Sequence, residues 1–144
     1  MMIFGKRDET LEYRKRIGVY GIIQDQAGRF LTVEDENGLY LVGGGVDDGE
    51  PLVDALKREA LEETGYRIQI VGEALGIAQR HWVSKNQPDW SQHNIGHFYC
   101  CELLEKVAEP IEAEPMVWAT LAELEQRLFH EHQLYMVKKS QSLK

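Results

Sequence analysis

Sulfur, proline and long apolar runs are scarce in this chain of 144 residues. It has four prolines and only two cysteines, which are adjacent at Cys100 and Cys101. A disulfide between neighbouring residues would be strained, and the pair forms no recognisable metal motif, so we expect neither a disulfide framework nor a zinc site. We interpret both cysteines as packing residues in a reducing compartment, on opposite faces of one strand.

No stretch of the sequence approaches the roughly 20 apolar residues that a membrane span requires. Residues 1–15 carry charges and lack the apolar core of a signal peptide, so we expect a cytoplasmic protein with no membrane partner. Positive charge is also in the minority, with 16 Lys and Arg against 24 Asp and Glu and a formal net charge of −8. This balance argues against a nucleic acid polymer as partner, whereas a small phosphorylated ligand stays compatible if a bound metal reverses the local field.

What the sequence does contain is a series of short strand patterns around one strongly marked helix. Strand patterns cover residues 16–24, 29–34, 39–42, 66–71, 73–82, 94–103 and 116–119. Asn37-Gly38 predicts a tight turn, and residues 84–92 have the composition of an exposed loop. We see no internal repeat and no linker, so residues 1–144 are expected to form a single domain, with a mixed sheet and helices on both of its faces.

The marked helix has clear start and stop signals. Pro51 fits the first helical position, and Gly65 fits the left-handed position that ends a helix. A second helical pattern begins at Thr120, which forms a capping box with Glu123, and a break is expected near His130.

The chemistry of the chain concentrates in this first helix. Glu59, Glu62 and Glu63 stand at positions i, i+3 and i+4, so the helical repeat brings their side chains to one patch of surface. Like charges placed so closely repel, and a multivalent cation is the natural explanation for them. Oxygen ligands in this number suit Mg²⁺ or Mn²⁺ better than zinc.

An apolar stripe on the same helix predicts where two of these carboxylates point. The stripe consists of Leu52, Ala55, Leu56 and Ala60. Glu59 and Glu63 lie on its continuation, so we expect them to face the protein body. A carboxylate at the edge of an apolar layer needs a positive partner, either an arginine or a metal, because desolvating an unpaired charge is costly.

Residues 44–66 resemble the Nudix box, G-x5-E-x7-R-E-U-x-E-E-x-G-U, where U is a large aliphatic residue. The chain matches every fixed position of the motif, with Gly44, Glu50, Arg58, Glu59, Glu62, Glu63 and Gly65. A solvated acidic helix, the alternative interpretation, would place no demand on the arginine and the glycines at these spacings. Ala60 and Tyr66 depart from the U positions, and Val42 replaces a proline that many members have, which we expect to alter loop stiffness alone. The resemblance implies an α/β/α sandwich with a mixed β-sheet.

The resemblance also implies a division of roles. Glu59, Glu63 and the backbone carbonyl of Gly44 are the implied metal ligands, with Mg²⁺ as the cofactor and Mn²⁺ as its alternative. Glu62 or Glu59 would accept a proton from water, and the residues alone do not choose between them. Arg58 is expected to orient a glutamate through a bidentate contact.

Two groups of residues outside the box are further candidates. Members of the family often add an acidic ligand from a later loop, and Glu112 or Glu114 stands where one is expected, although a surface charge is the favoured interpretation of each. Trp82 and Tyr99 could stack a base, although aromatic residues in strands more often belong to the core. The histidines show neither nucleophile nor zinc spacing, and we interpret them as ordinary surface or core residues.

The resulting prediction is a metal-dependent hydrolase that cleaves the pyrophosphate linkage of a nucleoside diphosphate derivative. A nucleoside triphosphate, normal or oxidised, is the first choice of substrate, as in the MutT type. A dinucleoside polyphosphate or nucleotide-sugar hydrolase is the alternative within the enzyme class, and a non-catalytic nucleotide-binding Nudix module is the alternative outside it. We expect a small nucleotide as partner and a monomer or homodimer as the assembly.

Overall fold

One mixed sheet of eight strands organises the computed structural model, which describes residues 1–112 and 114–143. The strands are β1 (Met2–Phe4), β2 (Glu12–Ile23), β3 (Phe30–Asp35), β4 (Gly38–Gly45), β5 (Tyr66–Ile70), β6 (Gly76–Ser84), β7 (Gln87–Lys106) and β8 (Met116–Ala119). Their order is β1-β6-β7-β2-β4-β3-β8, and β5 pairs with one part of β7. The β1–β6 and β2–β7 pairs are parallel and the others are antiparallel.

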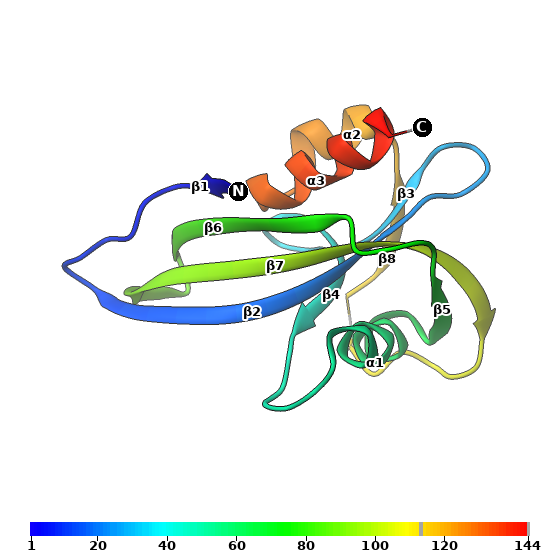
Figure 1. Ribbon diagram of the computed structural model, residues 1–144, viewed down its shortest axis with the longest axis horizontal. Coiled ribbons are helices and arrows are strands. Elements are labelled where there is room, and N and C mark those ends of the chain that lie inside the picture. Colours follow the sequence, from blue (N-terminus) through cyan, green and yellow to red (C-terminus); the bar gives the residue numbers. More distant parts are fainter. Residues whose placement is uncertain (113, 144) are drawn as a thin grey trace.

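Helices cover both faces of this sheet. Helix α1 (Leu52–Thr64) lies on one side, and α2 (Leu121–Arg127) and α3 (Glu131–Ser142) lie together on the other (Figure 1). Two apolar clusters fill the spaces between the layers, one under α1 and one under α2 and α3. The predicted α/β/α sandwich with a mixed sheet is therefore confirmed. No helix in the described part of the chain is long and apolar enough to cross a membrane.

Side-chain alternation along the central strands separates the two clusters. Val19 and Tyr20 follow one another on β2, yet Val19 packs in the cluster under α1 and Tyr20 in the cluster under α3. On β7, which runs parallel to β2 for twelve residue pairs, Phe98 belongs to the α3 side and Cys101 to the α1 side. From Gly18 to Ile23, β2 is buried on both faces, as expected for a central strand with a parallel pairing.

Helix α1 has the boundaries that its sequence predicts, apart from one residue at the start. Pro51 is the extended residue that precedes the helix and not its first turn. Gly65 ends the helix in the left-handed conformation, with φ of 78°, and its N–H donates to the carbonyl of Leu61. A Cβ at this position would lie 2.0 Å from the carbonyl oxygen of Ala108, so close packing as well as backbone conformation requires glycine.

The prediction of an exposed loop at residues 84–92 is wrong. Strand β6 continues to Ser84, which pairs with Gln87 at the start of β7, so only two residues separate the strands. Trp90 pairs with Glu12 of β2, and its ring carries the guanidinium of Arg14 at 4.1 Å. This end of the sheet is mostly exposed on both faces, so its strands have a polar composition that resembles a loop. The tight turn predicted at Asn37-Gly38 lies one residue earlier, at Glu36-Asn37, because Asp35 pairs with Gly38.

Candidate active site

Arg58 is the centre of a hydrogen-bond network on α1. Its Nε and Nη2 donate to the two carboxylate oxygens of Glu50 at 2.8 and 2.9 Å, and Nη2 also donates to the carbonyl of Gly45 at 3.1 Å. Its Nη1 donates to Glu59 at 3.1 Å and to Glu62 at 3.3 Å. The hydrogen bonds raise the pKa of Arg58 and lower the pKa of Glu50. The bidentate contact therefore goes to Glu50, and it ties the helix to the preceding loop.

Glu63 is a buried carboxylate held by the backbone of the glycine loop. Its side chain lies on the buried face of α1, as predicted, and its Oε1 accepts a hydrogen bond of 2.8 Å from the N–H of Gly43. Burial raises the pKa of Glu63 to about 9, and the hydrogen bond from Gly43 opposes this only in part. A nearby cation would favour the ionised form.

Glu59 lies against the next glycine of the loop. A Cβ at Gly44 would lie 2.7 Å from the Cδ of Glu59 and 2.8 Å from both of its oxygens, so a side chain at this position would displace the carboxylate. Burial raises the pKa of Glu59, against the opposing effect of Arg58. Glu59 and Glu63 therefore both lie against the segment Gly43–Gly44 of the glycine loop.

Three carboxylates converge close to this loop. One oxygen each from Glu59, Glu62 and Glu112 lies within 4.8 Å of the others. Burial raises the pKa of Glu112, and the charges of Glu114 and Glu62 add to the effect. Carboxylate oxygens at this spacing fit a hard divalent cation such as Mg²⁺ or Mn²⁺. The structure thus brings Glu112 to the box, while the metal ligands themselves stay a prediction.

The segment that follows β7 carries Glu112 to this place. The N–H groups of Ile111 and Glu112 donate to the carbonyl of Glu62 at 2.8 and 3.1 Å. The N–H of Val107 donates to the carbonyl of Gly65 at 2.9 Å. These bonds satisfy carbonyl groups at the end of α1 that have no partner inside the helix. The position of Glu112 therefore depends on how α1 ends.

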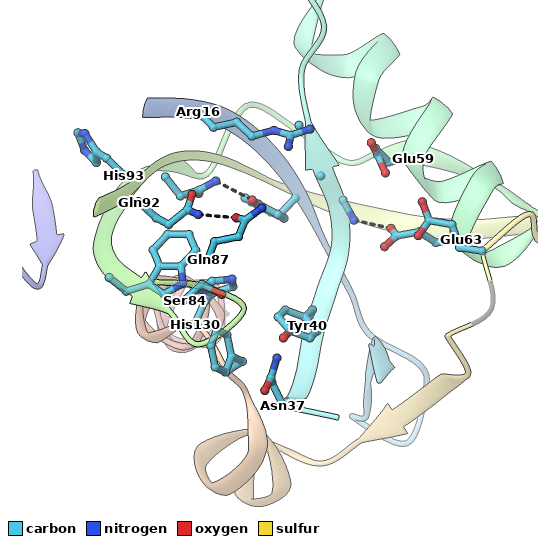
Figure 2. A pocket seen from close by; sticks show the side chains of 18 residues that line it. Arg16, Asn37, Tyr40, Glu59, Glu63, Ser84, Gln87, Gln92, His93 and His130 are labelled. Atoms are coloured by element: carbon cyan, nitrogen blue, oxygen red, sulfur yellow. Dashed lines mark hydrogen bonds between the residues drawn. The ribbon is translucent and has the colours of Figure 1, made fainter. Parts of the chain in front are cut away.

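A pocket of about 490 Å³ opens beside the carboxylates, within the range of roughly 300–1,000 Å³ that small-molecule sites occupy. Glu59, Glu63 and Glu112 line one end of it. The other end has aromatic walls, formed by Tyr40, Trp82, Phe129 and His130. Figure 2 shows Arg16 near the carboxylate end, with Tyr40, Asn37 and His130 grouped away from it. The pocket therefore joins an acidic end to an aromatic end.

The two predicted stacking residues have different places. Trp82 lines the pocket. Tyr99 packs instead against the apolar cluster under α1 and is not among the pocket residues, which departs from the expectation. The reason is the alternation of side chains along β7, which directs neighbouring residues to opposite faces of the sheet.

Several pocket residues had no signal in the sequence. Arg16 comes from β2, Asn37 from the hairpin before β4, Tyr40 from β4 itself, and His130 from the residue that precedes α3. These four positions share no spacing or motif, and only the tertiary fold assembles them. The predicted break in the helix near His130 was the one local sign that this histidine has a special position.

Comparison with known proteins gives the family. The family model described as NUDIX domain matches residues 13–139. The chain belongs to the Nudix family. This confirms the predicted Nudix hydrolase, and the match extends well beyond the box on which the resemblance was based. No curated protein sequence shows significant similarity to the chain.

Solved structures share the Nudix fold at low sequence identity. A NUDIX hydrolase from Nitrosomonas europaea is 17% identical, with 91% of each chain covered and a TM-score of 0.73. A MutT protein from Methanosarcina mazei Go1 is 21% identical over 93% of this chain and 99% of that one, with a TM-score of 0.70. A MutT NUDIX hydrolase from Burkholderia pseudomallei is 25% identical over 88% and 98%, with a TM-score of 0.67.

Proposed function

We propose that this Nudix hydrolase cleaves the pyrophosphate linkage of a nucleoside diphosphate derivative in the presence of Mg²⁺ or Mn²⁺, with a nucleoside triphosphate as the first choice. The single observation that carries the proposal is the convergence of Glu59, Glu62 and Glu112 beside the glycine loop, at one end of a pocket whose other end is aromatic. Carboxylates and aromatic rings at opposite ends suit a ligand with phosphates at one end and a base at the other.

The proposed metal site uses residues of the box together with Glu112. Glu59, Glu63 and the carbonyl of Gly44 are the proposed ligands, with Glu62 and Glu112 close to them. A divalent cation held there would neutralise phosphate charge, align a water molecule and stabilise the leaving phosphate. Mg²⁺ and Mn²⁺ are proposed because the donors are carboxylate and carbonyl oxygens.

The protein side chains have separable tasks in this proposal. Arg58 holds Glu59 and Glu62 through its Nη1 and anchors itself on Glu50, so the carboxylates keep one arrangement. Glu62 or Glu59 accepts the proton of the attacking water. Arg16 lines the same end of the pocket and adds positive charge where phosphates would lie. Trp82 is proposed to contact the base at the other end.

The substrate class has rivals that the fold alone does not separate. Solved structures with this fold include a UDP-X diphosphatase, an ADP-ribose pyrophosphatase from Streptococcus suis and an Ap4A hydrolase from C. elegans, at 16% to 20% identity. Dinucleoside polyphosphates and nucleotide sugars are therefore the alternative substrates. The presence of every box glutamate argues against a module that only binds nucleotide.

A substrate screen tests the proposal. Purified protein is incubated with nucleoside triphosphates, dinucleoside polyphosphates and nucleotide sugars, with Mg²⁺ or with EDTA, and the nucleotide products are separated and quantified by anion-exchange chromatography. We expect turnover of at least one class with Mg²⁺, none with EDTA, and a rate about 100-fold lower for Glu62→Gln. Full turnover after chelation, or wild-type rates in both Glu59→Gln and Glu62→Gln, would overturn the proposal.

A further inference from the structure

His130 stands at the aromatic end of the pocket, where nothing in the Nudix box reaches. Its ring meets Trp82 edge-on, with centroids 4.8 Å apart, and lies 5.5 Å from the ring of Tyr40 and 4.9 Å from that of Phe129. It precedes the first turn of α3 and makes no side-chain capping bond to that helix. The side chain is therefore held by aromatic neighbours and not used to begin the helix.

Arg80 determines which nitrogen of this ring carries the proton. The Nη1 of Arg80 lies 2.9 Å from the Nδ1 of His130 and also donates to the carbonyl of Phe129 at 3.0 Å. A guanidinium can only donate hydrogen bonds, so the Nδ1 of His130 must be the acceptor. In the neutral ring the proton then lies on Nε2. Burial, together with the charges of His132 and Arg80, lowers the pKa of His130 to about 3, so the ring stays neutral at physiological pH.

The Nε2–H of His130 has no hydrogen-bond partner among the described residues. Among the described residues, the fully buried side-chain nitrogen and oxygen atoms without a hydrogen-bond partner are Arg80 Nε, His81 Nδ1 and His132 Nδ1. The Nε2 of His130 is not among these atoms. This nitrogen is therefore not fully buried, and the residue to which it belongs lines the pocket (Figure 2). The aromatic end thus offers one oriented, uncharged donor to a ligand.

The surroundings of this donor favour one kind of ligand group. The guanidinium of Arg80 stands directly behind the imidazole, and its nearest carboxylate, that of Glu131, is 3.7 Å from it and mostly exposed. A positive charge behind a hydrogen-bond donor attracts a carbonyl oxygen and repels an amino group, which carries partial positive charge on its hydrogens. Trp82 also lines the pocket, and its flat apolar ring is the kind of surface on which the ring that bears the carbonyl can stack.

We propose that His130, positioned by Arg80, recognises a carbonyl oxygen on the nucleobase of the substrate, so that the site prefers oxo bases to the corresponding amino bases. The assignment rests on the proposed function, because it takes the carboxylate end of the pocket as the place of the phosphates. His130 is then a specificity-determining residue and Arg80 is its positioning residue.

Substrate pairs that differ at this one edge of the base test the preference. Values of kcat/KM are measured for ITP against ATP and for UTP against CTP, because each pair exchanges an oxo for an amino group. We expect wild type to favour the oxo member of at least one pair by about 10-fold or more. His130→Leu should bring that ratio to within about 2-fold of unity, chiefly by slowing the oxo substrate, while His130→Gln, which keeps a donor, should retain part of the preference.

His97→Leu is the matched control, since His97 is a half-buried histidine of β7 that is not among the pocket residues. It should leave the ratio unchanged. If wild type shows no oxo preference in either pair, or if His130→Leu slows both members of a pair equally, the ring only packs and the proposal is overturned. Thermal melting of each variant separates loss of folding from loss of recognition.

Two measurements keep the inference separate from the proposed function. The ¹⁵N spectrum of the histidine rings reports the tautomer without any substrate: we expect the His130 proton on Nε2 in wild type and a mixture of tautomers in Arg80→Met. Calorimetric binding of IMP against AMP, and of UMP against CMP, to the metal-free protein tests the preference without turnover. A protein that hydrolyses no nucleotide but binds the oxo monophosphate more tightly supports the inference and refutes the proposed function. A His130 proton on Nδ1 in wild type, or equal binding within both pairs, overturns the inference itself.

Discussion

At the scale of single residues, the ionisation of Glu63 depends on its burial in the folded protein and on whether a cation is bound. Its pKa in the folded, metal-free protein is about 9, against an ordinary value of 4.5. The pKa of Glu63 is higher in the folded protein than in the unfolded chain. Its contribution to the free energy of unfolding is therefore complete below a pH of about 4.5 and is lost as the pH rises toward about 9. A bound cation would reverse the preference by stabilising the carboxylate.

Glu63→Gln isolates this residue. The amide does not titrate and can still accept the hydrogen bond from Gly43, so in EDTA the melting temperature of the variant should fall less than that of wild type between pH 6 and pH 9. With Mg²⁺, the variant should lose the thermal stabilisation that wild type gains. Melting curves followed by circular dichroism, with and without metal, make both comparisons. Equal stabilisation of the two proteins by Mg²⁺ would show that Glu63 is not a ligand.

Arg58 depends on the planar shape of its guanidinium as well as on its charge. Arg58→Lys keeps the charge but cannot reach both oxygens of Glu50 and also Gly45, Glu59 and Glu62. We expect kcat to fall at least about tenfold, because the carboxylates lose their common support. Arg67→Lys is the control, since Arg67 pairs with Glu105 on the exposed surface and lines no part of the acidic end. Loss of rate in the control alone, or in both equally, would contradict a special role for Arg58.

The site divides into a part that the sequence could predict and a part that it could not. Glu59, Glu62 and Glu63 lie on one helix, so the helical repeat alone brings them together and the burial of Glu63 follows from the apolar stripe. Tyr40 and His130 come from elements far apart in the chain, and no local rule places them together. Tyr99 was misplaced because the aromatic character of a strand residue does not say which face of the sheet it occupies.

At the scale of elements, the end of α1 supports the chemistry through the segment that follows β7. Gly65 has a positive φ, and a Cβ there would also collide with the backbone of Ala108. Gly72 has a similar φ of 75° but has open space around it, so it is a matched control. Gly72→Ala should cost about 1–2 kcal/mol of unfolding free energy from the backbone conformation alone.

Gly65→Ala should cost more than Gly72→Ala, and it alone should slow catalysis, because Ala108 must move and the segment that carries Glu112 moves with it. Urea unfolding and steady-state rates of both variants measure the two effects. If the two variants lose equal stability and keep wild-type rates, the close packing against Ala108 contributes nothing to stability, and the position of Glu112 does not depend on it.

The strands show the same division between local and tertiary information. β3, β5 and β8 lie within a residue or so of their predicted bounds, because turn residues flank short apolar runs. β7 was predicted as residues 94–103, yet it begins at Gln87. Its first residues pair with β6 and β2 while exposing polar side chains, so hydrophobic periodicity contains no sign of them. The contribution of β1 was also missed, since only three residues pair there.

At the scale of the whole molecule, two histidines, the half-buried His130 and the buried His132, couple stability to acid. His130 and His132 have pKa values of about 3 in the folded protein, lowered chiefly by burial from 6.5. Since the folded pKa is the lower one, the unfolded chain takes up protons first, and stability present above about 6.5 is lost as the pH falls toward about 3. The loss by pH 5 is up to about 2 kcal/mol per histidine.

His132→Gln tests this coupling. Glutamine can still donate to the Oδ1 of Asn94, which accepts from the Nε2 of His132 at 2.8 Å, but it does not titrate. The fall in melting temperature between pH 7 and pH 5 should therefore be smaller in the variant than in wild type. A parallel fall in the two proteins would assign the acid sensitivity to other groups.

The parallel pairing of β2 with β7 has a kinetic consequence. Glu12 pairs with Trp90 and Ile23 with Cys101, so the longest strand contact in the sheet joins residues 78 positions apart. Forming contacts between residues so far apart in the chain costs loop-closure entropy before the contacts themselves stabilise the fold. Domains in which such contacts dominate refold in milliseconds to seconds. On the ribosome, β2 cannot complete its pairing on this side until residue 101 has left the exit tunnel. The Nudix box is therefore synthesised well before the sheet that supports it can close, and the nascent chain must stay soluble through that interval.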